Sequence, residues 1–320
     1  MNNGTLLEVN DITVEYVTQG QRFAAISDVT LDIAEGETLG LVGESGCGKS
    51  TTGRAIIQLP TPTAGHVKFE GQELTGLTHN EMRQIRQRLQ IIFQDPVSSL
   101  NPRRRVKDIV AEPLIIAGNK DAADIDRKVR EVLNAVGMDP DITLDRRPHQ
   151  FSGGQCQRIC IARALIMEPK LIVCDEPVSA LDVSVQAQIL NLLEDMKERY
   201  GLTLLFISHD LAVVKNISDR VAVMYLGKFC ELADSERIYE APAHPYTAGL
   251  MATIPEIGDK AIDSGPALAG EIPSPLNPPS GCRFRTRCPQ AQEKCTAEEP
   301  AFRDIEPGPQ VACHFPLLGE

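Results

Sequence analysis

A glycine-rich stretch between a predicted strand and a predicted helix carries the clearest chemistry in this sequence. Residues 43–51 read GESGCGKST and match the G-x-x-x-x-G-K-[ST] pattern, directly after the apolar run 38–42. Such glycines let the backbone curl so that N–H groups face a phosphate, and the following helix adds its positive dipole end. The lysine supplies charge for the β- and γ-phosphates, and the serine hydroxyl can coordinate Mg²⁺. The stretch predicts a nucleoside triphosphate site with contacts from Gly43, Ser45, Gly46, Cys47, Gly48, Lys49, Ser50 and Thr51, and with Ser50 also on Mg²⁺.

Two carboxylates end a second apolar run, at Asp175 and Glu176 after residues 171–174. A short continuous apolar run is typical of a strand buried on both faces, so the acids would stand at an edge of the sheet. Asp175 would hold Mg²⁺, directly or through water, opposite Ser50. Glu176 would act as general base on the attacking water, and burial would favour that role. The alternative, an exposed acidic pair, is disfavoured by the four apolar residues before it.

Two more polar residues follow predicted strands. Gln94 ends the strand predicted from residue 90, where its amide can reach Mg²⁺, a metal-bound water or the attacking water. A glutamine without further context would be a surface amide. His209 follows residues 202–208, a strand expected beside the one that ends at Asp175. We therefore expect His209 to face the γ-phosphate, the alternative being a structural or solvated histidine.

A second helix start also suits an anion. Ser152 is a good N-cap, Gly153 and Gly154 leave backbone N–H groups exposed, and Gln155 precedes a strong helical pattern at 159–167. One nucleotide does not need two such devices. The second therefore belongs to a different nucleotide.

The elements that must position these residues predict an α/β fold. Alternation of apolar and polar residues at 6–16 and 25–33 predicts two antiparallel strands of a small β-subdomain beside the nucleotide-binding core. Tyr16 ends the first strand and could stack on an adenine ring, or pack beneath the sheet. Helical periodicity at 109–116 and 124–136 predicts a helical subdomain inserted between two halves of the sheet.

Charge and composition exclude other classes. The chain has 320 residues and a formal net charge of −12. That charge argues against a nucleic-acid partner, because a phosphate backbone requires clustered Lys and Arg. No stretch reaches the roughly 18–20 apolar residues that cross a bilayer, and residues 1–5 lack the basic-then-apolar pattern of a secretory signal. We expect a cytosolic chain that reaches a membrane through partners.

Taken together, these motifs resemble those of the nucleotide-binding subunits of ABC transporters. The phosphate loop, Gln94, the signature at 152–155, the carboxylates 175–176 and His209 occur in that family's order over about residues 5–235. Phe151 is a departure, since the family usually has leucine there; the exchange is apolar for apolar. The resemblance implies a P-loop NTPase fold of the ABC ATPase type. It has a RecA-like core, an antiparallel β-subdomain and a helical subdomain at about 95–168.

The resemblance also implies a shared site. In this family two ATPase domains pack head to tail, and the signature of each contacts the γ-phosphate bound by the other. The resemblance therefore adds Ser152, Gly153, Gly154, Gln155 and the D-loop Asp182 to the nucleotide contacts. Its helical subdomain resembles the surface that receives a coupling helix from a membrane subunit.

The C-terminal stretch narrows the resemblance. APAHPYT at 241–247, IPSPLNPP at 272–279 and Gly281-Cys282 look like the tail of dipeptide and oligopeptide importer ATPases, closest to their F-type subunit. That resemblance implies a peripheral subunit on the cytoplasmic face of the inner membrane, with ATP and Mg²⁺ as cofactors. The implied partners are two permease subunits, a second related ATPase in a heterodimer, and an extracytoplasmic peptide-binding protein. Glutathione and nickel importers share the tail and stay open as alternatives. The resemblance implies an ATPase domain at 5–235 and a small, irregular C-terminal domain at 236–320.

The cysteines fall into two groups. Five lie in the first 230 residues, where a reducing cytosol predicts free thiols packed as small hydrophobes: Cys47, Cys156, Cys160, Cys174 and Cys230. Four lie beyond residue 281 in a Pro-rich segment: Cys282, Cys288, Cys295 and Cys313. Their wide, irregular spacing favours a structural [4Fe–4S] cluster over zinc, whose structural sites use short C-x₂₋₄-C pairs. Free thiols, zinc or a redox-labile pair are the alternatives.

Two other classes of ABC protein are less compatible with the sequence. An ABC ATPase of DNA repair or translation would carry a long coiled-coil insert or two cassettes, and this chain has one cassette with an insert of ordinary length. An exporter half would be fused to membrane helices or work beside drug-type permeases. The tail favours import.

Overall fold

The computed structural model describes residues 4–18, 20–254, 270–305 and 308–317. These residues divide into two compact units. Unit 1 comprises Met1–Gly4, Ala34–Gly36 and Gly76–Phe206, and unit 2 comprises Thr5–Ile33, Glu37–Thr75 and Ile207–Glu320. Residues 1–3, part of the stretch tested above for a secretory signal, lie outside the described residues.

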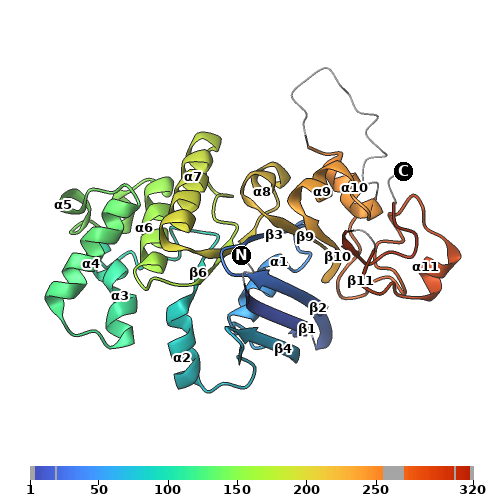
Figure 1. Ribbon diagram of the computed structural model, residues 1–320, viewed down its shortest axis with the longest axis horizontal. Coiled ribbons are helices and arrows are strands. Elements are labelled where there is room, and N and C mark those ends of the chain that lie inside the picture. The colour runs from blue at the N-terminus through green and yellow to red at the C-terminus, as the bar shows by residue number, and fades with distance from the viewer. Residues whose placement is uncertain (1–3, 19, 255–269, 306–307, 318–320) are drawn as a thin grey trace. The chain divides into compact units, whose positions relative to one another are not determined.

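One sheet of unit 2 is the predicted antiparallel subdomain. Its strand order is β2 (Gln21–Ala34), β1 (Thr5–Thr18), β4 (Ala64–Phe69) and β5 (Gln72–Glu73) (Figure 1). β1 pairs antiparallel with β4, with Leu7 opposite Phe69 and Val9 opposite Val67. All four of these side chains are fully buried, so one face of the sheet contributes to the core.

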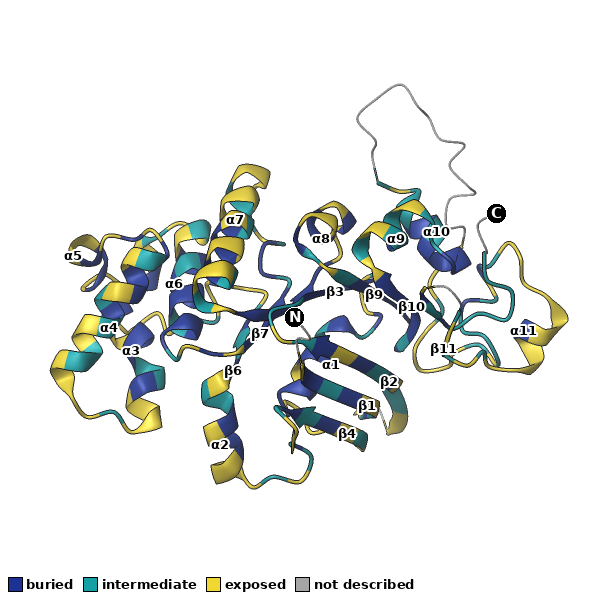
Figure 2. Ribbon diagram, viewed as in Figure 1, coloured by how far each residue is buried: buried dark blue, intermediate teal, exposed yellow. Residues whose placement is uncertain are grey.

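The other strands of unit 2 carry the phosphate loop. Their order is β11 (Arg303–Asp304), β12 (Gln310–Val311), β10 (Lys228–Asp234), β9 (Arg220–Tyr225) and β3 (Thr38–Val42). β3 and β9 are parallel, and β10 returns antiparallel to β9. Every residue of β3 is buried (Figure 2), as expected for a strand covered on both faces. The helices of unit 2 are α1 (Lys49–Ile56), α8 (Leu211–Ile217), α9 (Ser235–Glu240), α10 (Pro245–Met251) and α11 (Glu293–Ala297).

Unit 1 contains three strands and most of the longer helices. The strand order is β8 (Thr203–Ile207, its last residue in unit 2), β7 (Leu171–Asp175) and β6 (Leu89–Ile92), with β6 and β7 parallel. The helices are α2 (His79–Arg88), α3 (Val106–Ala117), α4 (Ala122–Ala135), α5 (Pro140–Thr143), η1 (Pro148–Gln150), α6 (Gly153–Leu165) and α7 (Val183–Tyr200). In α7 the buried residues Ile189, Leu192, Leu193 and Met196 follow the spacing of one helix face.

The observed architecture confirms the predicted fold class, with one local difference near the site. The sequence predicted that the strand before Gln94 runs up to it, whereas β6 ends at Ile92. Gln94 therefore stands on the loop after the strand, free of the sheet's hydrogen-bond ladder. Among the described residues, none of the helices combines the length and apolar character that crossing a bilayer requires.

Candidate active site

The phosphate loop has the backbone that its glycines predict. Gly43, Gly46 and Gly48 all have positive φ, at 149°, 79° and 109°. A Cβ built on Gly43 would lie 2.2 Å from the Met224 carbonyl oxygen, so the loop packs too closely on β9 for any side chain there. Ser45 and Gly46 are exposed, which leaves the outer turn of the loop open to a ligand. The geometry is that of an anion-binding concavity.

The helix after the loop begins at Lys49, where the sequence places it. Its N-cap is Gly48, and no side chain caps its first turn. The Lys49 ammonium donates hydrogen bonds to the carbonyl oxygens of Gly43, at 2.8 Å, and Glu44, at 3.2 Å. Lys49 is only 4% exposed. The loop thus has uncapped backbone amides at a helix start and a buried cation beside them, which is a favourable environment for a phosphate.

Cys47 has a packing role in this loop. Its side chain is buried, and burial raises the pKa of its thiol, an effect that the nearby Lys49 opposes. Its carbonyl oxygen accepts a hydrogen bond from the Gly227 N–H at 2.8 Å, which ties the loop to the turn between β9 and β10. A neutral, buried thiol leaves only the backbone of Cys47 for a ligand.

Two more of the predicted site residues belong to unit 2. Tyr16, near the end of β1, is 40% exposed, and its ring centroid lies 6.2 Å from that of Phe23. The ring is therefore neither packed beneath the sheet nor isolated on it. His209 is exposed and follows β8 immediately after the buried Ser208. Asp210, the next residue, caps α8 by accepting hydrogen bonds from the N–H groups of Ala212 and Val213.

Unit 1 brings three predicted site residues together at the carboxyl ends of β6 and β7. Asp175 ends β7 and is completely buried. Glu176 follows in a left-handed conformation, with φ at 49°, and its side chain is half-buried, so the burial that would favour its role as a base is only partial. The Gln94 amide donates a 2.8 Å hydrogen bond to the Glu176 carboxylate. A non-glycine residue with positive φ at such a position indicates backbone strain of the kind concentrated at functional sites.

The signature segment starts α6 with a complete capping box. The Ser152 hydroxyl accepts from the Gln155 N–H, and the Gln155 side chain accepts from the Ser152 N–H. A Cβ built on Gly154 would lie 2.5 Å from a methyl carbon of Val185 on α7, so close helix packing demands glycine here. Asp182 is exposed at the N-cap of α7, and its side chain makes no capping hydrogen bond.

The predicted site residues therefore fall into two groups. The phosphate loop, Tyr16 and His209 belong to unit 2. Gln94, the two carboxylates, the signature and Asp182 belong to unit 1.

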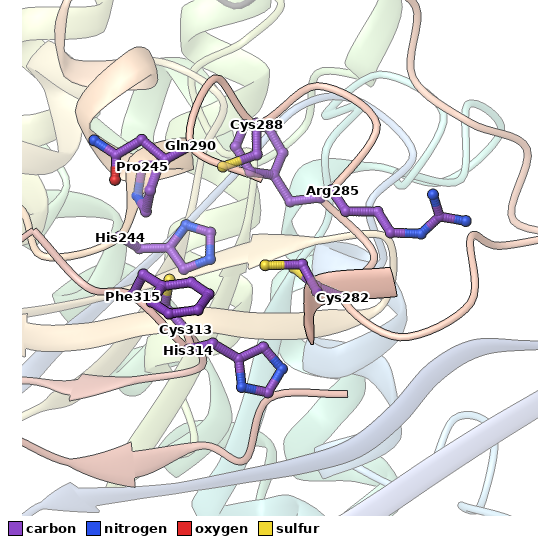
Figure 3. A pocket seen from close by; sticks show the side chains of 11 residues that line it. His244, Pro245, Cys282, Arg285, Cys288, Gln290, Cys313, His314 and Phe315 are labelled. Carbon is purple, nitrogen blue, oxygen red and sulfur yellow. The ribbon is translucent and has the colours of Figure 1, made fainter. Parts of the chain in front are cut away.

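The nine cysteines also fall into two structural groups. The five in the first 230 residues are buried and free, which confirms the prediction made for them. The other four line one small cavity of unit 2, together with the His244 and His314 side chains (Figure 3). Burial raises the pKa of the Cys282, Cys288 and Cys313 thiols, and it raises that of Cys313 to about 11. Within the described parts of the chain, no three His, Cys, Asp or Glu side chains are grouped closely enough to hold a metal ion. The four thiols therefore line one cavity without forming a metal site, and the cluster stays a prediction.

Sequence reasoning missed two residues that contact the phosphate loop, both through Glu44. Arg287 donates two hydrogen bonds to the Glu44 carboxylate, and the Tyr246 hydroxyl accepts one from the Glu44 N–H. Glu44 occupies a variable position of the loop motif, and its two partners come from the C-terminal stretch. The HPYT motif at 244–247 was the one available signal, and it contains Tyr246.

A phosphate loop before a buried helix, an acidic strand end and a self-capped signature helix on this α/β scaffold define the class of ATP-binding cassettes. Comparisons with known proteins agree. Residues 26–179 match the ABC transporter family, and residues 230–295 match the family described as oligopeptide/dipeptide transporter, C-terminal region. A putative peptide import ATP-binding protein of Brucella ovis is 50% identical over 313 residues, covering 98% of each chain. The oligopeptide transport ATP-binding protein OppF of Escherichia coli is 52% identical over 310 residues, covering 93% of this chain and 92% of its own.

Solved structures show the same scaffold. The ATP-binding cassette MJ0796, in a dimeric post-hydrolysis state with ADP and Pi, is 29% identical with a TM-score of 0.66 and covers 72% of this chain and 98% of its own. The protein cbiO1 of Clostridium perfringens is 26% identical with the same TM-score of 0.66, covering 74% of this chain and 91% of its own. This chain belongs to the ABC transporter family, as an ATP-binding subunit with the oligopeptide/dipeptide transporter C-terminal region. Membership implies an ATPase coupled to transport that uses ATP and Mg²⁺.

Proposed function

We propose that this chain is the ATP-hydrolysing subunit that powers uptake of dipeptides or oligopeptides by an ABC importer. The observation that carries the proposal is the pairing of one cassette with one importer-type C-terminal region in the same chain. Relatives named for peptide import match this chain along nearly its whole length. We take residues 5–235 as the ATPase domain, with its helical subdomain at about 95–168, and residues 236–320 as the C-terminal domain.

In the proposed nucleotide site, different residues bind the phosphates, bind Mg²⁺ and catalyse hydrolysis. Backbone N–H groups of residues 43–51 and the Lys49 ammonium bind the phosphates, and Tyr16 stacks on the adenine. Ser50, Gln94 and Asp175 would hold Mg²⁺, directly or through water. The bound ion would neutralise charge on the β- and γ-phosphates. Glu176 acts as general base, and its hydrogen bond from Gln94 supports this by fixing the carboxylate. His209 places the γ-phosphate.

The proposed assembly is a heterodimer of two related ATPase subunits. Residues 152–155 and Asp182 of this chain cover the nucleotide bound by the partner ATPase, and the partner's signature covers the nucleotide bound here. Two permease subunits receive the motion at the cytoplasmic face of the inner membrane, and an extracytoplasmic binding protein delivers the peptide.

Glu176→Gln tests the catalytic assignment. The amide cannot take a proton from water, so the variant should bind ATP, hydrolyse it at least tens of times more slowly, and accumulate the closed ATP-bound dimer. Stopped-flow or steady-state phosphate release and size-exclusion chromatography with ATP measure the two effects. Unchanged turnover would refute the role of Glu176. Peptide uptake by the reconstituted importer, compared with glutathione and nickel, tests the cargo.

We also propose that the four C-terminal cysteines bind a [4Fe–4S] cluster with a structural role. The support is that four thiols from separate parts of the segment line one cavity. A cluster spreads its thiolate ligands around a cube, so it does not require the tight grouping that one zinc ion needs. A cluster would supply covalent links to a segment with little secondary structure. Anaerobic reconstitution followed by iron and sulfide analysis tests this, and a colourless protein without iron would rule the cluster out.

A further inference from the structure

The described residues after 235, here called the C-terminal segment, contact the phosphate loop at Glu44. The two terminal nitrogens of the Arg287 guanidinium, Nη1 and Nη2, donate to the Glu44 carboxylate, at 2.6 and 3.0 Å. The Arg287 side chain is only 4% exposed, and that of Glu44 is 23% exposed. A bidentate pair in this setting fixes direction as well as distance, and it is much less screened by solvent than a surface ion pair.

A second contact fixes the backbone of the same residue. The Glu44 N–H donates to the Tyr246 hydroxyl at 3.0 Å, and the carbonyl of the same peptide unit, that of Gly43, accepts from Lys49 at 2.8 Å. The peptide between Gly43 and Glu44 is therefore anchored on both sides. Its orientation decides where the first turn of the phosphate loop points.

The anchors are themselves rigid. Tyr246 is fully buried and packs against the rings of Tyr225 and Phe284, with centroids 4.8 and 5.3 Å away. The Arg287 guanidinium lies 5.8 Å from the centroid of the Tyr225 ring, within the range of a cation–π contact. Tyr225 ends β9, so this aromatic group joins the C-terminal segment to the sheet under the loop. Phe284 and Arg287 lie between Cys282 and Cys288 in the sequence, and both of these cysteines line the small cavity described above.

We propose that Arg287 and Tyr246 are positioning residues of the nucleotide site, through which the C-terminal segment holds the phosphate loop in its phosphate-accepting shape. The proposal rests on the proposed function, in which residues 43–51 bind the nucleotide. A preorganised loop avoids an ordering cost when ATP binds. Loss of either contact should therefore weaken ATP binding, while turnover of bound ATP changes little.

The test measures the equilibrium affinity for ATP in the full chain. Arg287→Met and Glu44→Gln should each raise Kd about 10- to 20-fold, the lower end of the range for a charged hydrogen-bonded pair. The Kd of the double variant should be no higher than that of the weaker-binding single variant, because both substitutions remove the same interaction between Arg287 and Glu44. Tyr246→Phe keeps the ring packing and removes only the hydroxyl, so a rise in Kd of about 2- to 5-fold is expected. In steady-state hydrolysis the change should appear in KM, with kcat within about twofold.

Arg285→Met is the matched control. Arg285 lies two residues before Arg287, and its guanidinium bonds to Ser280 rather than to the loop. The variant should keep the wild-type Kd within about twofold, as expected for an exposed polar contact. Exchanging the two charges, with Glu44→Arg and Arg287→Glu together, should recover part of the affinity that Glu44→Arg alone loses.

The outcomes separate this proposal from the proposed function. If Lys49→Ala loses ATP while Arg287→Met and Tyr246→Phe bind it normally, the loop is the nucleotide site and the positioning role is wrong. If Lys49→Ala also binds ATP normally, the proposed function itself fails. A fall in kcat with unchanged Kd in the Arg287 and Tyr246 variants would also overturn the positioning role. A variant that unfolds, as judged by thermal denaturation, is replaced by Tyr246→Phe and the charge exchange.

Discussion

Two helices of this chain begin next to a proposed phosphate, α1 after its N-cap Gly48 and α6 at Gly153, and the backbone N–H groups of their first turns are satisfied differently. In α1 no side chain caps the first turn, and the Lys49 ammonium folds back onto the carbonyl oxygens of its own loop. In α6 the first turn is capped by Ser152, which forms a reciprocal pair with Gln155. An uncapped helix start leaves its amides available for an anion, whereas a capped start has already satisfied part of its donors.

The difference fits the two roles proposed for these segments. In the proposed function the phosphate loop binds the phosphates of its own nucleotide, so its backbone N–H groups and the Lys49 ammonium must be able to bind them. The signature segment acts on a nucleotide that another subunit holds, and it must keep its shape before that subunit arrives. A capping box provides that stability within the chain.

Lys49→Ala should have the largest effect on ATP binding, and it changes the phosphate loop and the start of α1 without changing α6. Removing the cation deletes charged hydrogen bonds to two phosphates, so ATP affinity should fall at least about 50-fold. If the proposed heterodimer is purified, the number of bound nucleotides should fall from two to one, because the partner's own loop is intact. Equilibrium dialysis with labelled ATP gives that stoichiometry. Loss of binding at both sites would contradict the pairing model.

Much of the first helix could be predicted from the sequence, because local chemistry determines it. The motif at 43–51 gave the loop, and α1 begins at Lys49 as expected. Contacts across long sequence distances gave no such signal. Glu44 and Arg287 lie 243 positions apart, and no spacing rule joins them. The HPYT motif was visible, but its role depends on the packing of Tyr246 beneath the loop.

The second helix and the acidic strand end were predicted less completely. Ser152 was predicted as an N-cap and α6 does begin directly after it, at Gly153, but the reciprocal hydrogen bond from the Ser152 N–H to the Gln155 side chain was not predicted. The hydrogen bond between Gln94 and Glu176 joins two strand ends, and the sequence gives their chemistry without their separation. Burial was expected to favour Glu176 as a base, whereas its side chain is only half-buried.

Gly154→Ala should have an intermediate effect and tests why the second helix needs glycine. The added methyl group would meet Val185 on α7, so α6 or the Val185 side chain must shift, and a shift of α6 would cost about 1–3 kcal/mol in stability. In the proposed heterodimer such a shift would move the signature away from the partner's nucleotide, so ATP hydrolysis should fall about tenfold. The affinity of this chain for its own ATP should not change.

Val185→Ala provides the control for that prediction. Combined with Gly154→Ala, it makes room for the new methyl group and should recover most of the lost hydrolysis. If activity stays low although stability returns, the glycine is needed for direct approach to the nucleotide rather than for packing against α7.

Ser152→Ala should have the smallest effect and tests the capping box itself. Loss of this N-cap should cost about 1 kcal/mol of stability at the start of α6. Hydrogen exchange of the Gln155 amide, which now donates to the Ser152 hydroxyl, should become faster, whereas exchange in the middle of α6 should not. Ser152→Asp keeps an acceptor at the cap and should retain slow exchange. Because its negative charge would face the partner's γ-phosphate, it should still impair hydrolysis. If Ser152→Asp hydrolysed ATP normally, the signature helix would be a structural cap rather than part of the partner's nucleotide site.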